Sequence, residues 1–103
     1  MQYNKLVRDN IPEIIERSGK KPIYRILDDA EYIEALERKL DEEVAEFHES
    51  KSLEELADIC DVVYALVYAL GVDYMELIKA RITKQGERGG FYEKLFLIEV
   101  KEK

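Results

Sequence analysis

The sequence contains a single cysteine, has no tryptophan and lacks any long run of apolar residues. Cys60 cannot form an internal disulfide, which suits a reducing compartment. The longest apolar stretch lies within residues 59–72, is interrupted by Asp61 and is too short to span a bilayer. No apolar segment follows the charges of residues 1–10, so no signal peptide is visible. These absences predict a cytoplasmic protein with no membrane partner.

The sequence also has no excess of basic residues. The formal net charge of the 103-residue chain is −7, which argues against a nucleic-acid binder, because such a protein needs a basic surface. The composition is 47% apolar and 38% charged, which is ordinary for a globular protein. The length suits one small domain, so residues 1–103 are expected to form a single domain.

Most of the chain has the periodicity of α-helices. Apolar residues recur with i, i+3, i+4, i+7 spacing in the first long segment: Ile33, Leu36, Leu40, Val44 and Phe47. Capping residues and glycines mark the ends of the segments. The expected helices span residues 8–18, 28–50, 53–70 and 74–85, with a glycine-rich break over residues 86–90.

The second long helix is apolar on nearly every side after Ile59. A helix of this kind is buried all round, and one neighbouring helix cannot cover it. We therefore expect a homo-oligomer, either a homodimer or a homotetramer. The predicted fold class is mainly α: an antiparallel helical bundle completed by oligomerisation.

A small β element is expected beside the helices. Residues 21–27 are rich in β-branched and aromatic side chains, and residues 94–100 alternate in a way that is typical of a strand. The two segments are predicted to pair as a two-stranded sheet.

Two pairs of acidic residues lie on the long helices. Glu43 with Glu46, and Glu55 with Asp58, are each three residues apart, so each pair points to one side of its helix. If the helices pack antiparallel, the four carboxylates converge. Sites made only of oxygen ligands prefer Mg²⁺ or Mn²⁺ to zinc, so the expected cofactor is Mg²⁺, with Mn²⁺ as the alternative.

A purely structural interpretation of these acids is also available. Glu55 has the position of a capping-box partner for Ser52, and acids are common on solvated helix faces. However, Glu43 lies at the edge of the apolar stripe, and Asp58 shares a face with Val62 on the apolar helix. Burying an unpaired carboxylate costs several kcal/mol, which a divalent cation would offset.

The motifs resemble a known superfamily. Glu42-Glu43-x-x-Glu46 followed by Glu55-x-x-Asp58 is similar to the signature of the all-α nucleoside triphosphate pyrophosphohydrolases, which include MazG, dimeric dUTPase and phosphoribosyl-ATP pyrophosphohydrolase. The stretches YNKLVRDNIPEII, KLDEEVAEF, EELADICDVVYAL and KQGERGGFYEKLFL resemble the short MazG-like, phosphoribosyl-ATP pyrophosphohydrolase-like group over most of the chain. The interval from Glu46 to Glu55 is shorter than is usual in MazG itself, which leaves less room for a base-recognising insertion.

The resemblance implies Mg²⁺-dependent cleavage of a nucleoside triphosphate between its α- and β-phosphates, which gives the monophosphate and pyrophosphate. It assigns the metal to four acids: Glu43, Glu46, Glu55 and Asp58. Glu43 or Glu46 is the expected catalytic acceptor of the water proton, because a carboxylate not fully used as a ligand can act as a base. His48, the only histidine, is expected on the surface.

Four cations are candidate ligands for the substrate phosphates: Lys5, Arg8, Lys84 and Arg88. Arginine forks and glycine-rich turns both suit phosphate oxygens, although Lys84 and Arg88 also suit the C-terminal end of a helix.

The leading hypothesis is a pyrophosphohydrolase that clears unwanted nucleotides. One alternative is the phosphoribosyl-ATP pyrophosphohydrolase of histidine biosynthesis. Another is a non-catalytic helical module that binds nucleotides or proteins.

Overall fold

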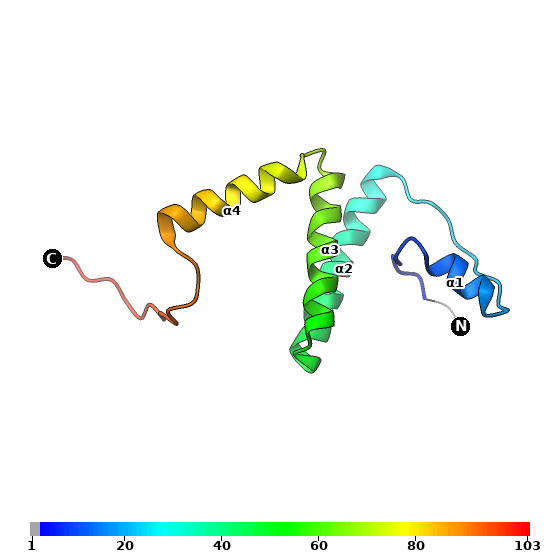
Figure 1. Ribbon diagram of the computed structural model, residues 1–103, viewed down its shortest axis with the longest axis horizontal. Coiled ribbons are helices and arrows are strands. Elements are labelled where there is room, and N and C mark those ends of the chain that lie inside the picture. Colours follow the sequence, from blue (N-terminus) through cyan, green and yellow to red (C-terminus); the bar gives the residue numbers. More distant parts are fainter. Residues whose placement is uncertain (1–2) are drawn as a thin grey trace. The chain divides into compact units, whose positions relative to one another are not determined.

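The computed structural model describes residues 3–103 and is mainly helical. The helices in this part of the chain are α1 (Ile11–Arg17), α2 (Asp29–Ser50), α3 (Leu53–Ala69) and α4 (Tyr74–Arg88) (Figure 1). Across residues 3–103, none of the helices is both long and apolar enough to cross a membrane.

The chain divides into two compact units, Met1–Val72 and Asp73–Lys103. In the first unit, α2 and α3 pack against each other along their length as a helical hairpin. The segment that contains α1 precedes the hairpin and is tied to it by ion pairs from Lys5 and Arg8. The second unit consists of α4 and an extended tail that follows Gly89.

A very short turn joins the two helices of the hairpin. Lys51 ends α2 in the left-handed conformation, with φ of 53°, and its backbone N–H donates to the carbonyl of Phe47 at 2.8 Å. Ser52 follows at once as the N-cap of α3, where its hydroxyl accepts from the backbone N–H of Glu55. A connection of this length requires neighbouring helices to run antiparallel. The predicted turn is therefore confirmed.

The start of α2 is the most elaborately capped end in the described chain. Asp28 accepts from the backbone N–H of Glu31 at 2.9 Å, and the Glu31 carboxylate accepts from the backbone N–H of Asp28 at 3.2 Å. This reciprocal pair is a capping box. The Arg25 guanidinium adds a bidentate contact, donating to Oε1 and Oε2 of Glu31 at 3.1 and 2.7 Å. The loop before α2 is thereby fixed to the first turn of the helix.

Very little of the described chain is buried. Leu36 of α2 and Val62 of α3 are the hydrophobic residues that reach the interior, at 2% and 8% exposure, and Glu43 joins them at 5%. Burying a side chain of this size contributes about 1.5–3 kcal/mol. Ordering the backbone of each residue costs about 1–2 kcal/mol. Most other apolar residues of the hairpin are half-buried or exposed, so the hairpin encloses few of them completely.

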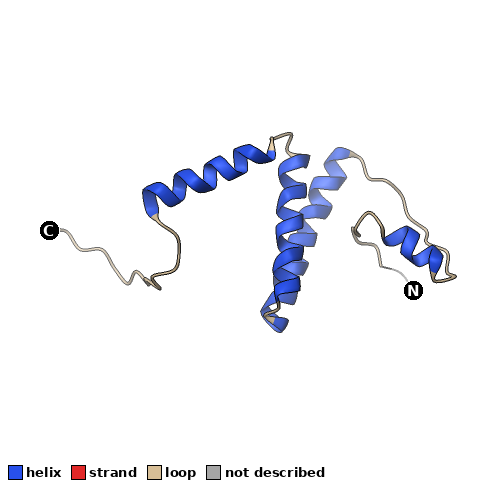
Figure 2. Ribbon diagram, in the orientation of Figure 1, coloured by secondary structure: helices blue, strands red, loops and turns tan. Residues whose placement is uncertain are grey.

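The expected two-stranded sheet is absent from residues 3–103 (Figure 2). Residues 21–27 and 94–100 are both irregular, and they belong to different units. Their apolar side chains stay exposed; Ile23 and Ile26 are both at 92%. A two-stranded ribbon is marginal without a covering layer, and β-branched composition alone does not supply one.

The helix boundaries are close to those expected, with two corrections. α1 is shorter than residues 8–18, because Asn10 is its N-cap and Pro12 occupies the first turn. α4 continues through Gly86 and ends at Arg88. Gly89 is its C-cap, with a φ of 81° that suits glycine. The glycine-rich break therefore begins at Gly89, because one glycine inside a helix costs only about 1 kcal/mol.

The Glu31 contacts predict a pH-dependent stability. The Arg25 guanidinium and the Asp28 backbone N–H lower the pKa of Glu31 from 4.5 to about 2. A lowered pKa in the folded state stabilises the fold above the unfolded pKa, and this stabilisation is lost as the pH falls from 4.5 to about 2. Glu31→Gln should therefore lower the midpoint of urea unfolding at pH 7, with a smaller difference at pH 3.

The matched control is Glu34→Gln, an exposed position on the same helix. Urea unfolding of the two variants and the wild type is followed by far-UV circular dichroism, which reports helix content. A difference between Glu31→Gln and wild type that is equally large at pH 3 and pH 7 would contradict the assignment.

Candidate metal site

Three carboxylates meet where α2 and α3 pack together. Glu43 of α2 and Glu55 and Asp58 of α3 each contribute an oxygen atom, and these atoms all lie within 4.8 Å of one another. Glu43 is buried, while the other two residues are half-buried. We call Glu43, Glu55 and Asp58 the acid cluster. Three of the four acids predicted from the sequence are thus brought together.

Helix geometry and the short turn explain the convergence. Glu55 and Asp58 are three residues apart, so they share one side of α3. The antiparallel turn at Lys51 sets that side against the part of α2 that carries Glu43. At the N-terminus of α3 the Ser52 hydroxyl accepts from the Glu55 backbone, and this cap uses the amide of Glu55 rather than its carboxylate. The Glu55 side chain is therefore available to the cluster.

Two oxygens of the acid cluster lack hydrogen-bond donors among the described residues. Oε2 of Glu43 and Oε2 of Glu55 are both shielded from solvent and unpaired. Burial, followed by the neighbouring carboxylates of Glu43 and Glu46, raises the pKa of Glu55 from 4.5 to about 7. Two buried acceptors that face each other are unfavourable unless a proton or a cation lies between them.

Glu46 lies beside the cluster rather than in it. Its carboxylate is near enough to Glu55 to contribute to the raised pKa of that group, but it is outside the set of mutually close oxygens. Glu46 is half-buried, one helical turn after Glu43. The prediction of four converging acids is thus met by three residues, with the fourth adjacent to Glu55.

Arg8 forms the outer boundary of the acid cluster. Its guanidinium donates to Asp58 Oδ1 at 2.5 Å and to Asp61 Oδ2 at 2.8 Å. Arg8 comes from the segment before α1, whose first turn is fixed by the Ile11 N–H donating to the Arg8 carbonyl at 3.0 Å. Asp58 is therefore shared between the cluster and an internal cation. A metal ion bound at the cluster would compete with Arg8 for this carboxylate.

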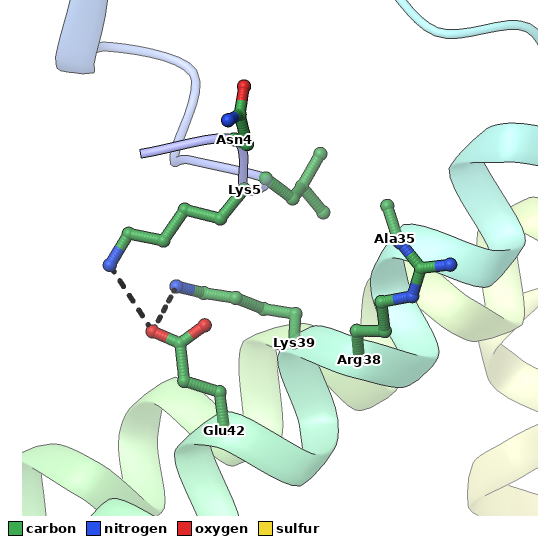
Figure 3. Close-up of a pocket in the computed structure, with 7 residues that line it drawn as sticks. Asn4, Lys5, Ala35, Arg38, Lys39 and Glu42 are labelled. Atoms are coloured by element: carbon green, nitrogen blue, oxygen red, sulfur yellow. Dashed lines mark hydrogen bonds and ion pairs between the residues drawn. The ribbon is translucent and has the colours of Figure 1, made fainter. Parts of the chain in front are cut away.

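A second group of cations lies on the other side of Glu43. Lys39 forms ion pairs with Glu43 at 3.2 Å and with Glu42 at 3.6 Å. Burial alone would lower the pKa of Lys39, but these two carboxylates outweigh it and the pKa is raised. Lys5 reaches Glu42 at 3.3 Å from the N-terminal segment, and Figure 3 shows both ammonium groups turned toward that carboxylate.

The four predicted phosphate ligands fall into two pairs. Lys5 and Arg8 lie against the hairpin that carries the acid cluster. Lys84 and Arg88 lie on α4 in the other unit, where Arg88 lines a hollow with Gly89 and Gly90. His48 is exposed, as expected.

Sequence reasoning did not assign roles to Lys39 or Asp61. Lys39 had a detectable signal, because it is four residues before Glu43 and can form an i, i+4 ion pair with it. The Arg8 to Asp61 contact joins positions 53 apart, and no local pattern predicts it.

Comparisons with known proteins add one relative. An uncharacterised protein of Mycolicibacterium smegmatis (strain ATCC 700084 / mc(2)155) is 63% identical over 41 residues, which is 40% of this chain and 42% of that protein. The match thus spans about two fifths of each protein's length. No family model matches the chain, and no solved structure gives a significant match. A functional conclusion therefore has to come from the site.

The crowding of carboxylates predicts a stability gain on removal of one charge. Glu55→Gln should raise the melting temperature of the metal-free protein, because the amide removes a repulsive charge and brings a donor to an unpaired buried acceptor. If a divalent cation binds at the acid cluster, any stabilisation that Mg²⁺ gives the wild type should be smaller in this variant.

Glu54→Gln is the matched control, since it removes the same charge from the first turn of α3. Thermal unfolding with and without Mg²⁺ compares the two variants. If Glu55→Gln melts no higher than Glu54→Gln in the absence of metal, the carboxylates do not repel one another as described.

Proposed function

We propose that this protein is a divalent-cation-dependent nucleoside triphosphate pyrophosphohydrolase of the cytoplasm, cleaving between the α- and β-phosphates. The observation that supports the proposal most is the acid cluster with its buried, unpaired Glu43 oxygen. An exposed group of acids is common without a metal. A carboxylate at 5% exposure with one oxygen lacking a donor is costly, and a bound cation would remove that cost.

The donor set fits a hard cation. Glu43, Glu55 and Asp58 offer only carboxylate oxygens, and neither histidine nor cysteine contributes to the group. Such a set suits Mg²⁺ or Mn²⁺ and not zinc. Magnesium retains coordination positions for water and for phosphate oxygens, which three protein ligands would leave open.

The chemistry then needs few further groups. When bound, Mg²⁺ would neutralise phosphate charge and lower the pKa of a water nucleophile. Phosphoryl substitution depends on such neutralisation and on positioning more than on covalent catalysis. The three carboxylates would hold the cation, and Arg8, displaced from Asp58, would be free to pair with a phosphate while remaining next to Asp61.

Glu46 is the better candidate for the proton acceptor. Glu43 was the other candidate, but it belongs to the acid cluster and is engaged by Lys39. Glu46 is adjacent to Glu55 yet outside the cluster, so its oxygens would remain free to accept a proton from water. Glu46→Gln should therefore reduce kcat by about 10²–10⁴-fold, the usual contribution of a general base, while Mg²⁺ binding is retained.

The direct test is pyrophosphate release from a panel of standard and damaged nucleoside triphosphates, with and without Mg²⁺. We expect Mg²⁺-dependent release that Glu43→Gln abolishes, because the substitution removes a charged ligand while keeping the side-chain shape. The matched control Glu34→Gln, exposed on the same helix, should retain activity. Full activity of Glu43→Gln would contradict the proposal.

Adding phosphoribosyl-ATP to the panel, and measuring nucleotide binding beside turnover, separates the alternatives. Turnover of phosphoribosyl-ATP alone would assign the protein to histidine biosynthesis. Nucleotide binding without any turnover would favour a non-catalytic binding module.

The proposal includes a homodimer or homotetramer. Apolar residues of the hairpin are exposed within the first unit, among them Leu56 at 43%, Tyr68 at 77% and Leu70 at 65%. Cys60 is exposed as well. A second copy of the hairpin would present the same apolar faces, so pairing of two hairpins would form a four-helix arrangement around a shared core.

Sedimentation equilibrium tests the assembly. The wild type should have a mass at least twice that of the 12.1 kDa chain, and Tyr68→Glu should shift the equilibrium toward monomer. The matched control is Tyr24→Glu, an aromatic position at 65% exposure outside the hairpin. A monomeric wild type with a sharp melting transition would contradict the proposed assembly.

A further inference from the structure

Asp61 lies beside the acid cluster without belonging to it. It is three residues after Asp58 on α3, so the two carboxylates share one side of the helix. A single guanidinium spans them: Arg8 donates through Nη2 to Asp58 at 2.5 Å and through Nη1 to Asp61 at 2.8 Å. Asp58 is half-buried, whereas Asp61 is exposed. Arg8 thus bridges an acid of the cluster and an acid outside it.

The segment before α1 keeps Arg8 at this place. It contacts both helices of the hairpin, because Lys5 pairs with Glu42 of α2 at 3.3 Å while Arg8 pairs with the two acids of α3. The Arg8 backbone is fixed as well, since its carbonyl accepts from the Ile11 N–H at 3.0 Å, where α1 begins. Arg8 therefore stays within reach of α3 when its contact with Asp58 is lost.

Asp58 cannot serve Arg8 and a cation equally well. A cation held by the acid cluster would draw on the same negative charge as the guanidinium, and the two positive charges would repel each other. Asp61 offers Arg8 a second partner on the same fork. Of the two hydrogen bonds, the one to Asp61 raises the pKa of Arg8 most, and the one to Asp58 comes second. Arg8 can therefore remain paired after Asp58 is engaged elsewhere.

We infer that Asp61 is a positioning residue for cation binding: it holds Arg8 at the edge of the acid cluster when Asp58 exchanges Arg8 for the cation. For the presence of that cation the inference rests on the proposed function. Asp61 acts through Arg8 and contacts no ligand itself. It lowers the cost of freeing Asp58, because Arg8 keeps one acid partner, and it neutralises a positive charge that would otherwise oppose the cation.

Two effects of opposite sign follow. Loss of Arg8 removes the internal competitor for Asp58, so cation binding becomes tighter. Loss of Asp61 leaves Asp58 as the acid partner of Arg8 on α3, so cation binding becomes weaker. The second effect requires Arg8 to be present. This dependence distinguishes a positioning role from a general effect of one negative charge on α3.

The test is a double-mutant cycle on the affinity of the full chain for Mn²⁺, followed through the electron paramagnetic resonance of the free ion without nucleotide. Arg8→Gln should bind Mn²⁺ about 5- to 10-fold more tightly than the wild type, and Asp61→Asn about 5- to 10-fold more weakly, which is the lower range of coupling between linked sites. The double variant Arg8→Gln/Asp61→Asn should have the affinity of Arg8→Gln alone. Asp61→Glu, which keeps the charge, should restore most of the wild-type affinity.

Two matched controls report the general effect of charge. Arg17→Gln removes an arginine whose ion pair lies within α1, and Glu54→Gln removes an acid from the first turn of α3. Both should change the affinity far less than the variants of Arg8 and Asp61. Equal affinities of Asp61→Asn and Glu54→Gln, or an equal loss from Asp61→Asn with and without Arg8, would overturn the inference. So would a wild type that binds no Mn²⁺.

Turnover measurements separate this result from the proposed function. An effect of Asp61→Asn on Mn²⁺ affinity that requires Arg8, with no hydrolysis of any triphosphate, would support the positioning role and refute the enzyme. Hydrolysis by a protein whose Mn²⁺ affinity Asp61→Asn leaves unchanged would refute the positioning role and support the enzyme.

Discussion

Like charges held together at a helix contact are the constraint on which the rest of this structure depends. Glu43 occupies one of the few interior positions of the hairpin, where a leucine would stabilise the protein more. Glu55 and Asp58 face it from α3. The contact between α2 and α3 is therefore less favourable than its apolar residues alone would make it. Proteins retain such unfavourable contacts mainly at functional sites.

The charges around the acid cluster are arranged in alternating sign. Lys39 lies on one side of Glu43, and Arg8 lies on the other side of Asp58. Both cations hold acids of the cluster in place. The internal ion pairs thus keep the carboxylates in position, and the partly exposed pairs of Arg8 do so at a modest gain in stability of about 0–1 kcal/mol. Such contacts can be exchanged for ligand contacts at little cost.

Local patterns in the sequence were sufficient to predict the helices and the meeting of Glu43 with Glu55 and Asp58, because spacing on a helix and a two-residue turn fix these positions. The prediction that residues 21–27 and 94–100 pair as a β element was wrong, because composition does not ensure that a partner strand is near. The Arg8 to Asp61 contact was missed. It depends on the path of the segment before α1 across the hairpin, and the sequence carries no periodic signal for that path.

The shortness of the turn at Lys51 also affects the order of folding. Glu43 and Glu55 are separated by only 12 positions, so the chain entropy lost in bringing them together is small. Loops of about this length close in roughly 10–100 ns, faster than any contact between distant parts of a chain. The acids can therefore meet in a nascent hairpin before the N-terminal segment has docked. A cation captured at that stage would stabilise the hairpin early, and so act as a folding nucleus.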